Sequence, residues 1–540
     1  MSTPPKSPFT IMIERATRRL EMFFRRCEDR DAALFVDPGL DEVIVRIVKP
    51  WTIHKCYKKI FTYNTNKTKF NYEIITIFTT GESHHLKEYI ESLTNTTAPP
   101  KEIMIIFTNR FTYVARQFLE QHGFLHRFTY EELRLPLWIL DPDLGTIEMK
   151  KSFLNVISDG GRLAVEAATD AMKQSIPVYE HFSNIFCIGK NAIDVGNNLP
   201  QNFQSGWSHI LIFDRNVDLL SIFLSTFTYE AIVAEQVGIV YGIVRLQNDE
   251  TILFSSDDSI SSTTRLLTMP EATSQIRDLS TTIKEEFESF KKSEADIHNK
   301  SAMIKELANR VVLDNKSISL HLDLLQACTD KAFGEPAFHT VLNSELDFLL
   351  NKDANLDAVN ECIALANDWR LPVRLLATYC LTTKIVPKID EIRQNIIDKF
   401  GVEALAALWT LEEAGIIQEG RKNNWHNTME KLKLYLGEVE SGPGTVYSGY
   451  YPLFLRILEK ILKMQWSDID VTLDELGIPH KVMGHRQTSV KRALVVFVGG
   501  SMYGEIAALR KNTSLGAAID VITTDLLSVN KILSQFGGSA

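Results

Sequence analysis

The chain has 540 residues, of which 45% are hydrophobic and 23% are charged, and its formal net charge is −10. This is the composition of an ordinary globular protein, so it excludes wholesale disorder and fibrous classes. The length suffices for three or four domains. An acidic chain lacks the basic face that nucleic-acid binding usually needs, so nucleic acid is not expected as a partner.

The cysteines and the apolar runs indicate the compartment. Six cysteines lie far apart and form no C-x-x-C pair, which favours free thiols in a reducing compartment over disulfides or a zinc knuckle. The N-terminal segment has no apolar core typical of a secretory signal. The longest apolar run, at residues 493–500, is too short to cross a bilayer. We therefore expect a cytoplasmic protein, or one peripheral on a membrane.

Short apolar runs alternate with helix-like stretches over the first 150 residues. The β-branched runs at residues 32–37, 42–48, 72–78 and 102–107 predict buried strands. Amphipathic stretches at 84–93 and 113–124 predict helices. This alternation predicts a parallel α/β sheet in a first domain at residues 1–140. The Pro- and Asp-rich segment 133–149 is interpreted as a connector out of that domain.

A second α/β pattern follows and is then interrupted. Strands are predicted at 184–189 and 209–213, and the last 50 residues again show strand, glycine turn and helix. We therefore predict a discontinuous second α/β domain made of residues 141–270 and 480–540.

The intervening residues 271–479 predict a helical domain, since they contain few strand-like runs. Its first part carries one apolar stripe at helical spacing, flanked by dense mixed charge typical of a solvated face. The stripe consists of Ile276, Leu279, Ile283, Phe287, Phe290, Ile297, Ile304, Leu307 and Val311. A break near residues 309–315 predicts a long helical hairpin at about 273–333.

Two segments could carry chemistry. The turn from Gly499 to Gly504 matches neither the G-x-S-x-G elbow nor a phosphate-binding loop, so tight packing is its favoured role. A hydrolase or nucleotide-binding enzyme using this turn remains the alternative. At the end of a predicted strand, Arg215 stands between Asp214 and Asp218, which favours an ion network that orders a loop over catalysis.

The 13 histidines are scattered, and no H-E-x-x-H motif occurs. His84 and His85 are adjacent, so on a helix their side chains should diverge and not share a metal. We therefore expect no catalytic residues, no metal and no cofactor. The chain is predicted to be an interaction protein rather than an enzyme.

At these segments the chain resembles the Sec/Munc-type (SM) family of syntaxin-binding, SNARE-regulating proteins. The best match is the vacuolar-protein-sorting class C branch, the SM subunit of the HOPS and CORVET tethers. One family segment maps onto Asp214, Arg215, Asp218, Leu219, Thr228, Tyr229 and Glu230. Four further segments follow the family order over most of the chain. Two positions depart from the family: Ile222 replaces a proline, and Ala308-Asn309 replaces a Leu-Pro pair.

The resemblance implies an arch-shaped fold with two parallel-sheet α/β domains and a helical domain inserted in the second. It implies SNARE partners, namely an R-SNARE and a syntaxin-type Qa-SNARE, and a helical-solenoid sorting subunit of a tethering complex. Membrane association would be peripheral, at the late endosome, lysosome or vacuole. The alternative is a sister-branch SM protein acting with a different solenoid partner in recycling or secretory-organelle traffic.

The expected SNARE site lies near the hairpin tip, where an amphipathic partner helix could lie along the apolar stripe and charges would fix its register. Its candidate residues are Asn309, Val312, Leu313, Asn315, Ser319 and Leu320. A structural network is expected to comprise Asp214, Arg215, Asp218 and Tyr229.

Overall fold

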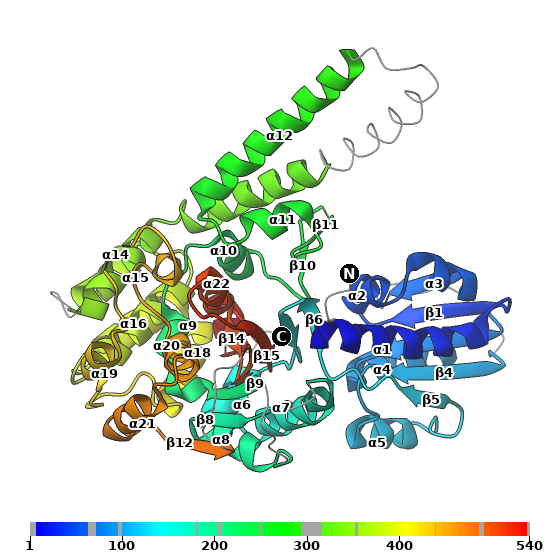
Figure 1. Cartoon of the computed structure of the whole chain (residues 1–540), viewed down its shortest axis with the longest axis horizontal. Coiled ribbons are helices and arrows are strands. Elements are labelled where there is room, and N and C mark those ends of the chain that lie inside the picture. The colour runs from blue at the N-terminus through cyan, green and yellow to red at the C-terminus, as the bar shows by residue number, and fades with distance from the viewer. Residues whose placement is uncertain are drawn as a thin grey trace. The chain divides into compact units, whose positions relative to one another are not determined.

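The computed structural model describes residues 7–62, 72–94, 100–179, 182–201, 208–248, 250–292, 316–350, 355–437, 439–484 and 491–536. The chain divides into two compact units (Figure 1). Unit 1 consists of Met1–Pro142 with Gln174–Tyr179, and unit 2 of Asp143–Lys173 with Glu180–Ala540. The finer division into three domains stays a prediction.

Unit 1 is built on a five-stranded sheet of order β2-β1-β3-β4-β5, in which every neighbouring pair is parallel. Its strands are β1 (Ala32–Val36), β2 (Lys59–Thr62), β3 (Ile74–Thr79), β4 (Glu102–Phe107) and β5 (Thr129–Glu132). Its helices are α1 (Pro8–Phe24), α2 (Leu40–Ile47), α3 (Pro50–Cys56), α4 (Ser83–Thr94) and α5 (Tyr113–Gln121). The strands β1 and β3 are buried along their whole length, as expected for a sheet covered on both faces.

The strand predicted at residues 42–48 is wrong, because this run forms α2. The chain turns at Gly39, whose φ is +84°, and acidic residues fill the first helical turn. Val43 and Ile44 are buried while Val45 is 41% exposed, which fits a helix with one face on the core. A short β-branched run does not distinguish a buried strand from a buried helix by periodicity.

Unit 2 is built on a sheet whose strands lie in the order β12-β8-β9-β13-β15-β7. These strands are β7 (Leu144–Thr146), β8 (Asn184–Ile188), β9 (Ser208–Asp214), β12 (His480–Gly484), β13 (Arg492–Val498) and β15 (Ala518–Thr523). The pairs from β8 through β7 are parallel, whereas β12 joins β8 antiparallel. The segment 133–149, interpreted as a connector, contains the boundary between the two units, and it also carries the strands β6 (Trp138–Asp141) and β7.

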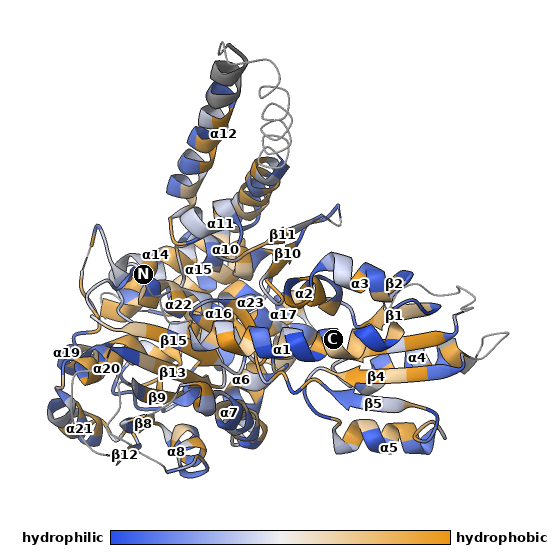
Figure 2. Cartoon of the chain, turned by 45° about the vertical axis from the view of Figure 1, so that its right-hand side comes forward, coloured by the Kyte–Doolittle hydropathy of each residue, from blue (hydrophilic) through white to orange (hydrophobic). Residues whose placement is uncertain are grey.

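The centre of this sheet joins segments that are distant in the sequence. The strand β9 pairs with β13 from Ser208↔Arg492 to Asp214↔Val498. The last 50 residues thus supply β13 and β15, together with α22 (Tyr503–Lys511) and α23 (Val529–Phe536). Figure 2 shows hydrophobic residues concentrated in the strands of the sheets.

Most of the chain between β9 and β12 is helical. Its helices include α9 (Leu220–Phe223), α10 (Tyr229–Gln236), α11 (Ser259–Thr264), α12 (Met269–Lys292), a helix at 316–332, α14 (Pro336–Leu350), α15 (Asp357–Leu365), α16 (Arg370–Thr382), α17 (Asp390–Phe400), α18 (Val402–Glu413), α19 (Trp425–Leu432), α20 (Leu453–Leu462) and α21 (Trp466–Glu475). The remaining helices of unit 2 are α6 (Ser152–Ser158), α7 (Arg162–Ser175, whose last two residues belong to unit 1) and α8 (Lys190–Asn197). In both views α12 and the helix at 316–332 project together from the body of unit 2 (Figures 1 and 2). Among the described residues, no helix is both long and apolar enough to cross a membrane.

A buried histidine in β9 predicts an acid-sensitive fold. His209 is 5% exposed, and its Nδ1 lies 3.0 Å from the Ser183 hydroxyl. Burial lowers the pKa of His209 to about 4. Between pH 6.5 and 4 the unfolded chain therefore takes up a proton that the folded protein does not.

As the pH is lowered from 6.5 to 4, this group should reduce the free energy of unfolding by up to about 1.4 kcal/mol per pH unit. Above pH 6.5 it should have no effect on that free energy. Urea denaturation at a series of pH values measures the slope. His209→Asn should flatten it, whereas His54→Asn, at an exposed position, should leave it unchanged. Equal slopes in the wild type and His209→Asn would contradict the prediction.

Candidate functional site at the base of the helical hairpin

The helix at 316–332 is held against unit 2 by one buried face. Ile318, Leu324, Leu325 and Cys328 are buried at helical spacing, together with His321. This pattern is the apolar stripe that amphipathic periodicity predicts. The opposite positions of the helix are left to solvent.

His321 joins this helix to two other elements. Its side chain is fully buried, its Nδ1 lies 3.0 Å from the Tyr229 hydroxyl, and its Nε2 lies 3.2 Å from Asp258 Oδ2. Both ring nitrogens therefore have a hydrogen-bond partner. The hydrogen-bonded series Tyr229–His321–Asp258 therefore connects α10 and the start of α11 to the hairpin.

Asp258 is fixed independently as the N-cap of α11, where it accepts from the Ser261 backbone N–H at 2.6 Å. Burial acts to raise the pKa of Asp258, but the hydrogen bonds from His321 and Ser261 outweigh it and hold the pKa below its usual value. The carboxylate thus stays ionised beside the buried imidazole.

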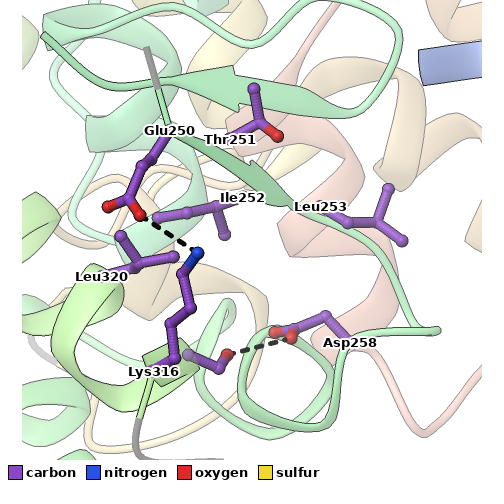
Figure 3. Close-up of a pocket in the computed structure, with 8 residues that line it drawn as sticks. Glu250, Thr251, Ile252, Leu253, Asp258, Lys316 and Leu320 are labelled. Atoms are coloured by element: carbon purple, nitrogen blue, oxygen red, sulfur yellow. Dashed lines mark hydrogen bonds and ion pairs between the residues drawn. The ribbon is translucent and has the colours of Figure 1, made fainter. Parts of the chain in front are cut away.

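A pocket of about 410 Å³ opens beside this network (Figure 3). It is lined by Glu250, Thr251, Ile252, Leu253, Asp258, Lys316, Ser317 and Leu320. The Lys316 ammonium pairs with Glu250 at 3.1 Å, and the Ser317 hydroxyl donates to Asp258 at 3.4 Å. Aliphatic side chains with paired charges suit an amphipathic segment of a partner better than a small polar substrate.

The predicted SNARE-site residues fall partly on this pocket. Leu320 is half-buried and lines it, and Ser319 is exposed on the same helix. The other four candidates, Asn309, Val312, Leu313 and Asn315, lie outside the described residues.

The predicted structural network is divided among three places. Arg215 is fully buried, donates to Glu505 at 2.6 Å, and donates to the Asp218 carbonyl at 2.5 Å. Asp218 also accepts from the Tyr450 hydroxyl at 3.1 Å. Burial raises the pKa of Glu505, although the Arg215 charge acts to lower it.

The other two members lie apart from Arg215's partners. Asp214 accepts the backbone N–H groups of Asn191 at 2.9 Å and Asn216 at 3.1 Å. Tyr229 belongs to the His321 network. The structure therefore joins Arg215 to Asp218 and adds Glu505 and Tyr450, which sequence reasoning missed.

Other side chains pack closely against the glycine turn after β13 and occupy the space beside it. Gly499 has φ +97°, and a Cβ there would lie 2.8 Å from the Arg215 Cβ. A Cβ at Gly500 would lie 2.5 Å from the Leu527 side chain, and one at Gly504 would lie 2.5 Å from Thr226. These contacts support close packing as the reason for the glycines and leave no room beside them for a phosphate.

A second buried arginine, Arg374 of α16, was also missed by sequence reasoning. It donates to the Phe223 carbonyl, to Glu235 and to the Ser225 hydroxyl, each at 2.7 Å, and pairs with Glu345 at 3.2 Å. The sequence does contain a sign of this site, because Arg374 stands inside an apolar run of α16. A charge that is buried with such a run requires charged or polar partners.

Comparisons with known proteins give consistent findings. A model of the Sec1 family matches residues 22–535. Vacuolar protein sorting-associated protein 33A of Rattus norvegicus is 25% identical over 481 residues, covering 80% of each chain. Vacuolar protein sorting-associated protein 33B of Homo sapiens is 21% identical over 586 residues, covering 94% of this chain and 93% of its own.

Solved structures resemble the chain over nearly its whole length. The Unc18–syntaxin 1 complex from Monosiga brevicollis matches with a TM-score of 0.63 and 14% identity, covering 97% of this chain and 99% of that chain. The SM protein Vps45 in complex with the Qa SNARE Tlg2 matches with a TM-score of 0.65 and 16% identity, covering 98% and 99%. The chain therefore has the fold of these proteins, and the predicted fold class is confirmed.

The Arg215–Glu505 pair generates a stability prediction. Arg215→Met leaves the carboxylates of Glu505 and Asp218 buried without the guanidinium, and should lower the free energy of unfolding by about 3–5 kcal/mol. Replacing both Arg215 and Glu505 by Met should recover part of that loss. Urea denaturation followed by circular dichroism measures both.

The matched control is Lys101→Ala, which breaks the exposed 2.8 Å pair with Glu73 and should cause no measurable change. A loss in Arg215→Met no greater than in this control would show that the buried pair does not hold unit 2 together.

Proposed function

This chain belongs to the Sec1 family, and on that premise we propose that it binds SNARE proteins and templates the assembly of SNARE complexes for fusion at endosomes, lysosomes or the vacuole. The matched structures include an Unc18 protein with syntaxin 1 and Vps45 with a Qa SNARE, which supports SNARE binding. The curated relatives carry the name vacuolar protein sorting-associated protein 33, which supports the endosomal and vacuolar setting.

The observation that carries the proposal is the projecting pair of helices. On α12, Ile276 and Ile283 are buried, while Arg277, Lys284 and Glu285 are exposed. Along α12 hydrophilic and hydrophobic residues alternate (Figure 2). The exposed face of α12 thus presents charges of both signs, which can set the register of a bound amphipathic helix. We assign the R-SNARE to this hairpin and a syntaxin-type Qa-SNARE to the same assembly.

The pocket at the hairpin base would extend this template. Leu320 offers apolar contact there, and the Lys316–Glu250 pair lies among the same lining residues. Because His321 anchors the helix, a bound segment would meet a surface that is already ordered, which lowers the entropic cost of association.

We further propose a helical-solenoid sorting subunit as partner within a tethering complex, which would bring this chain to the membrane. The helical part of unit 2 offers a surface for it on α18. Val402, Leu405 and Trp409 lie on one side of that helix and are 76%, 44% and 62% exposed. Large exposed apolar side chains grouped on one face are typical of protein–protein interfaces.

The sister branch remains the second candidate, because proteins 33A and 33B both match this chain. The identity of the solenoid subunit that co-purifies with the chain distinguishes the two. Calorimetric titration with ATP and GTP tests the enzyme alternative. If micromolar nucleotide releases no heat, the glycine turn has only a packing role.

The SNARE assignment predicts a loss of binding when the hairpin is altered. Replacing residues 293–315 by a short Gly/Ser linker should weaken capture of purified R-SNARE motifs by at least about tenfold, equal to 1.4 kcal/mol. Leu320→Asp should also weaken capture, because it places a charge in the apolar contact. Affinity is measured by interferometry with purified full-length chain.

The control is Leu365→Asp on α15, a leucine that is 41% exposed, and it should bind as the wild type does. If the chain with residues 293–315 replaced keeps the wild-type affinity and circular dichroism spectrum, the assignment of the R-SNARE to the hairpin is contradicted.

The solenoid assignment predicts a separate defect. Trp409→Asp should abolish co-purification of the solenoid subunit from cells while leaving SNARE capture in vitro intact. Val114→Asp, on α5 of unit 1 at a residue 64% exposed, is the control for a charged substitution on an exposed apolar site. Undiminished co-purification with Trp409→Asp would remove α18 from the interface.

A further inference from the structure

Two adjacent histidines and a glutamate converge at the start of α4 in unit 1. The ligand atoms of Glu82, His84 and His85 all lie within 4.8 Å of one another. The two imidazole rings have centroids 4.0 Å apart and are tilted by 50°. The expectation that adjacent histidines would diverge on a helix is therefore wrong at this place.

The physical reason is their position in the first turn. Each Cα–Cβ bond of a helix tilts toward its N-terminus. At interior positions adjacent side chains then point over different parts of the preceding turn. His84 and His85 have almost no turn before them, so both rings reach past the helix end toward Glu82.

His85 is oriented by a rigid carboxylate. Its Nδ1 lies 3.2 Å from Asp37 Oδ2, and Asp37 is 1% exposed at the end of β1. Asp37 also accepts from the Thr80 backbone N–H at 2.7 Å, from the Thr79 hydroxyl at 2.8 Å and from the Tyr89 hydroxyl at 3.0 Å. Asp37 therefore lies against the His85 ring and holds it beside the end of β1. A carboxylate next to a ligating histidine is a common support of metal sites.

The donor set and the local charge select a class of metal. Two imidazoles and one carboxylate suit Zn²⁺ and neighbouring divalent transition metals, whereas Mg²⁺ and Ca²⁺ prefer oxygen donors alone. Imidazole binds metal through a ring nitrogen that carries no proton. The carboxylates of Glu82 and Asp37 together balance the charge of a divalent ion.

We propose that Glu82, His84 and His85 form a binding site for Zn²⁺ or a similar divalent transition metal, with Asp37 positioning His85. The ion would link the first turn of α4 to the ends of β1 and β3, so its role is to brace this edge of the unit 1 sheet. The site is independent of the hairpin and of SNARE binding.

The test is titration of chelator-treated full-length chain with ZnCl₂ at pH 7 by calorimetry, with MgCl₂ and CaCl₂ in parallel. We expect one equivalent of Zn²⁺ at micromolar affinity, no heat from Mg²⁺ or Ca²⁺, and a raised melting temperature of unit 1. Co²⁺ in place of Zn²⁺ should give visible absorption typical of nitrogen and oxygen ligation.

His84→Ala should weaken Zn²⁺ binding by at least about tenfold, equal to 1.4 kcal/mol. Its side chain is 57% exposed, so the variant should fold. Glu82→Gln should act in the same direction. The control His54→Ala/His126→Ala removes two exposed histidines of the same unit and should bind as the wild type does. No Zn²⁺ binding, or equal affinity in His84→Ala and the control, would overturn the proposal.

Discussion

The pairing of β9 with β13 is the constraint on which the rest of unit 2 depends. The chain leaves the sheet after Asp214 and returns at Arg492, so residues 215–491 must begin and end at neighbouring strands. Beyond the carboxyl ends of these two strands, the buried side chains of Arg215 and Glu505 are in contact. Since a buried guanidinium without its carboxylate is strongly unfavourable, this pair allows few alternative arrangements of the strand ends.

The buried polar groups of the helical part extend that constraint outward. Arg374 ties α16 to Glu235 of α10 and Glu345 of α14. Tyr229, at the start of α10, in turn reaches His321 of the hairpin. Each connection satisfies groups that would be costly to bury alone. The proposed SNARE template is therefore joined to the other helices of unit 2 by buried hydrogen bonds and ion pairs.

Much of the fold could be predicted from local sequence, but contacts between distant residues could not. The strands β1, β3 and β4 appear as continuous apolar runs because both faces of the sheet are covered, whereas β2 and β5 are short, partly exposed and were missed. Residues 42–48 failed because a short buried helix has the same composition as a strand. Glu505 lies 290 positions from Arg215, and no local pattern links them.

For the site, Leu320 was chosen from its place in the hairpin, but the partners of His321 depend on tertiary packing. The family was recognisable because its motifs keep their order along the chain.

The position of β13 in the sheet has a consequence for synthesis on the ribosome. Since β13 lies between β9 and β15, a nascent chain that ends before residue 492 exposes one whole edge of β9. Unpaired strand edges recruit other strands and promote aggregation. Unit 2 must therefore remain incomplete until its last segment emerges, and a chain truncated there should require protection by cellular chaperones during translation.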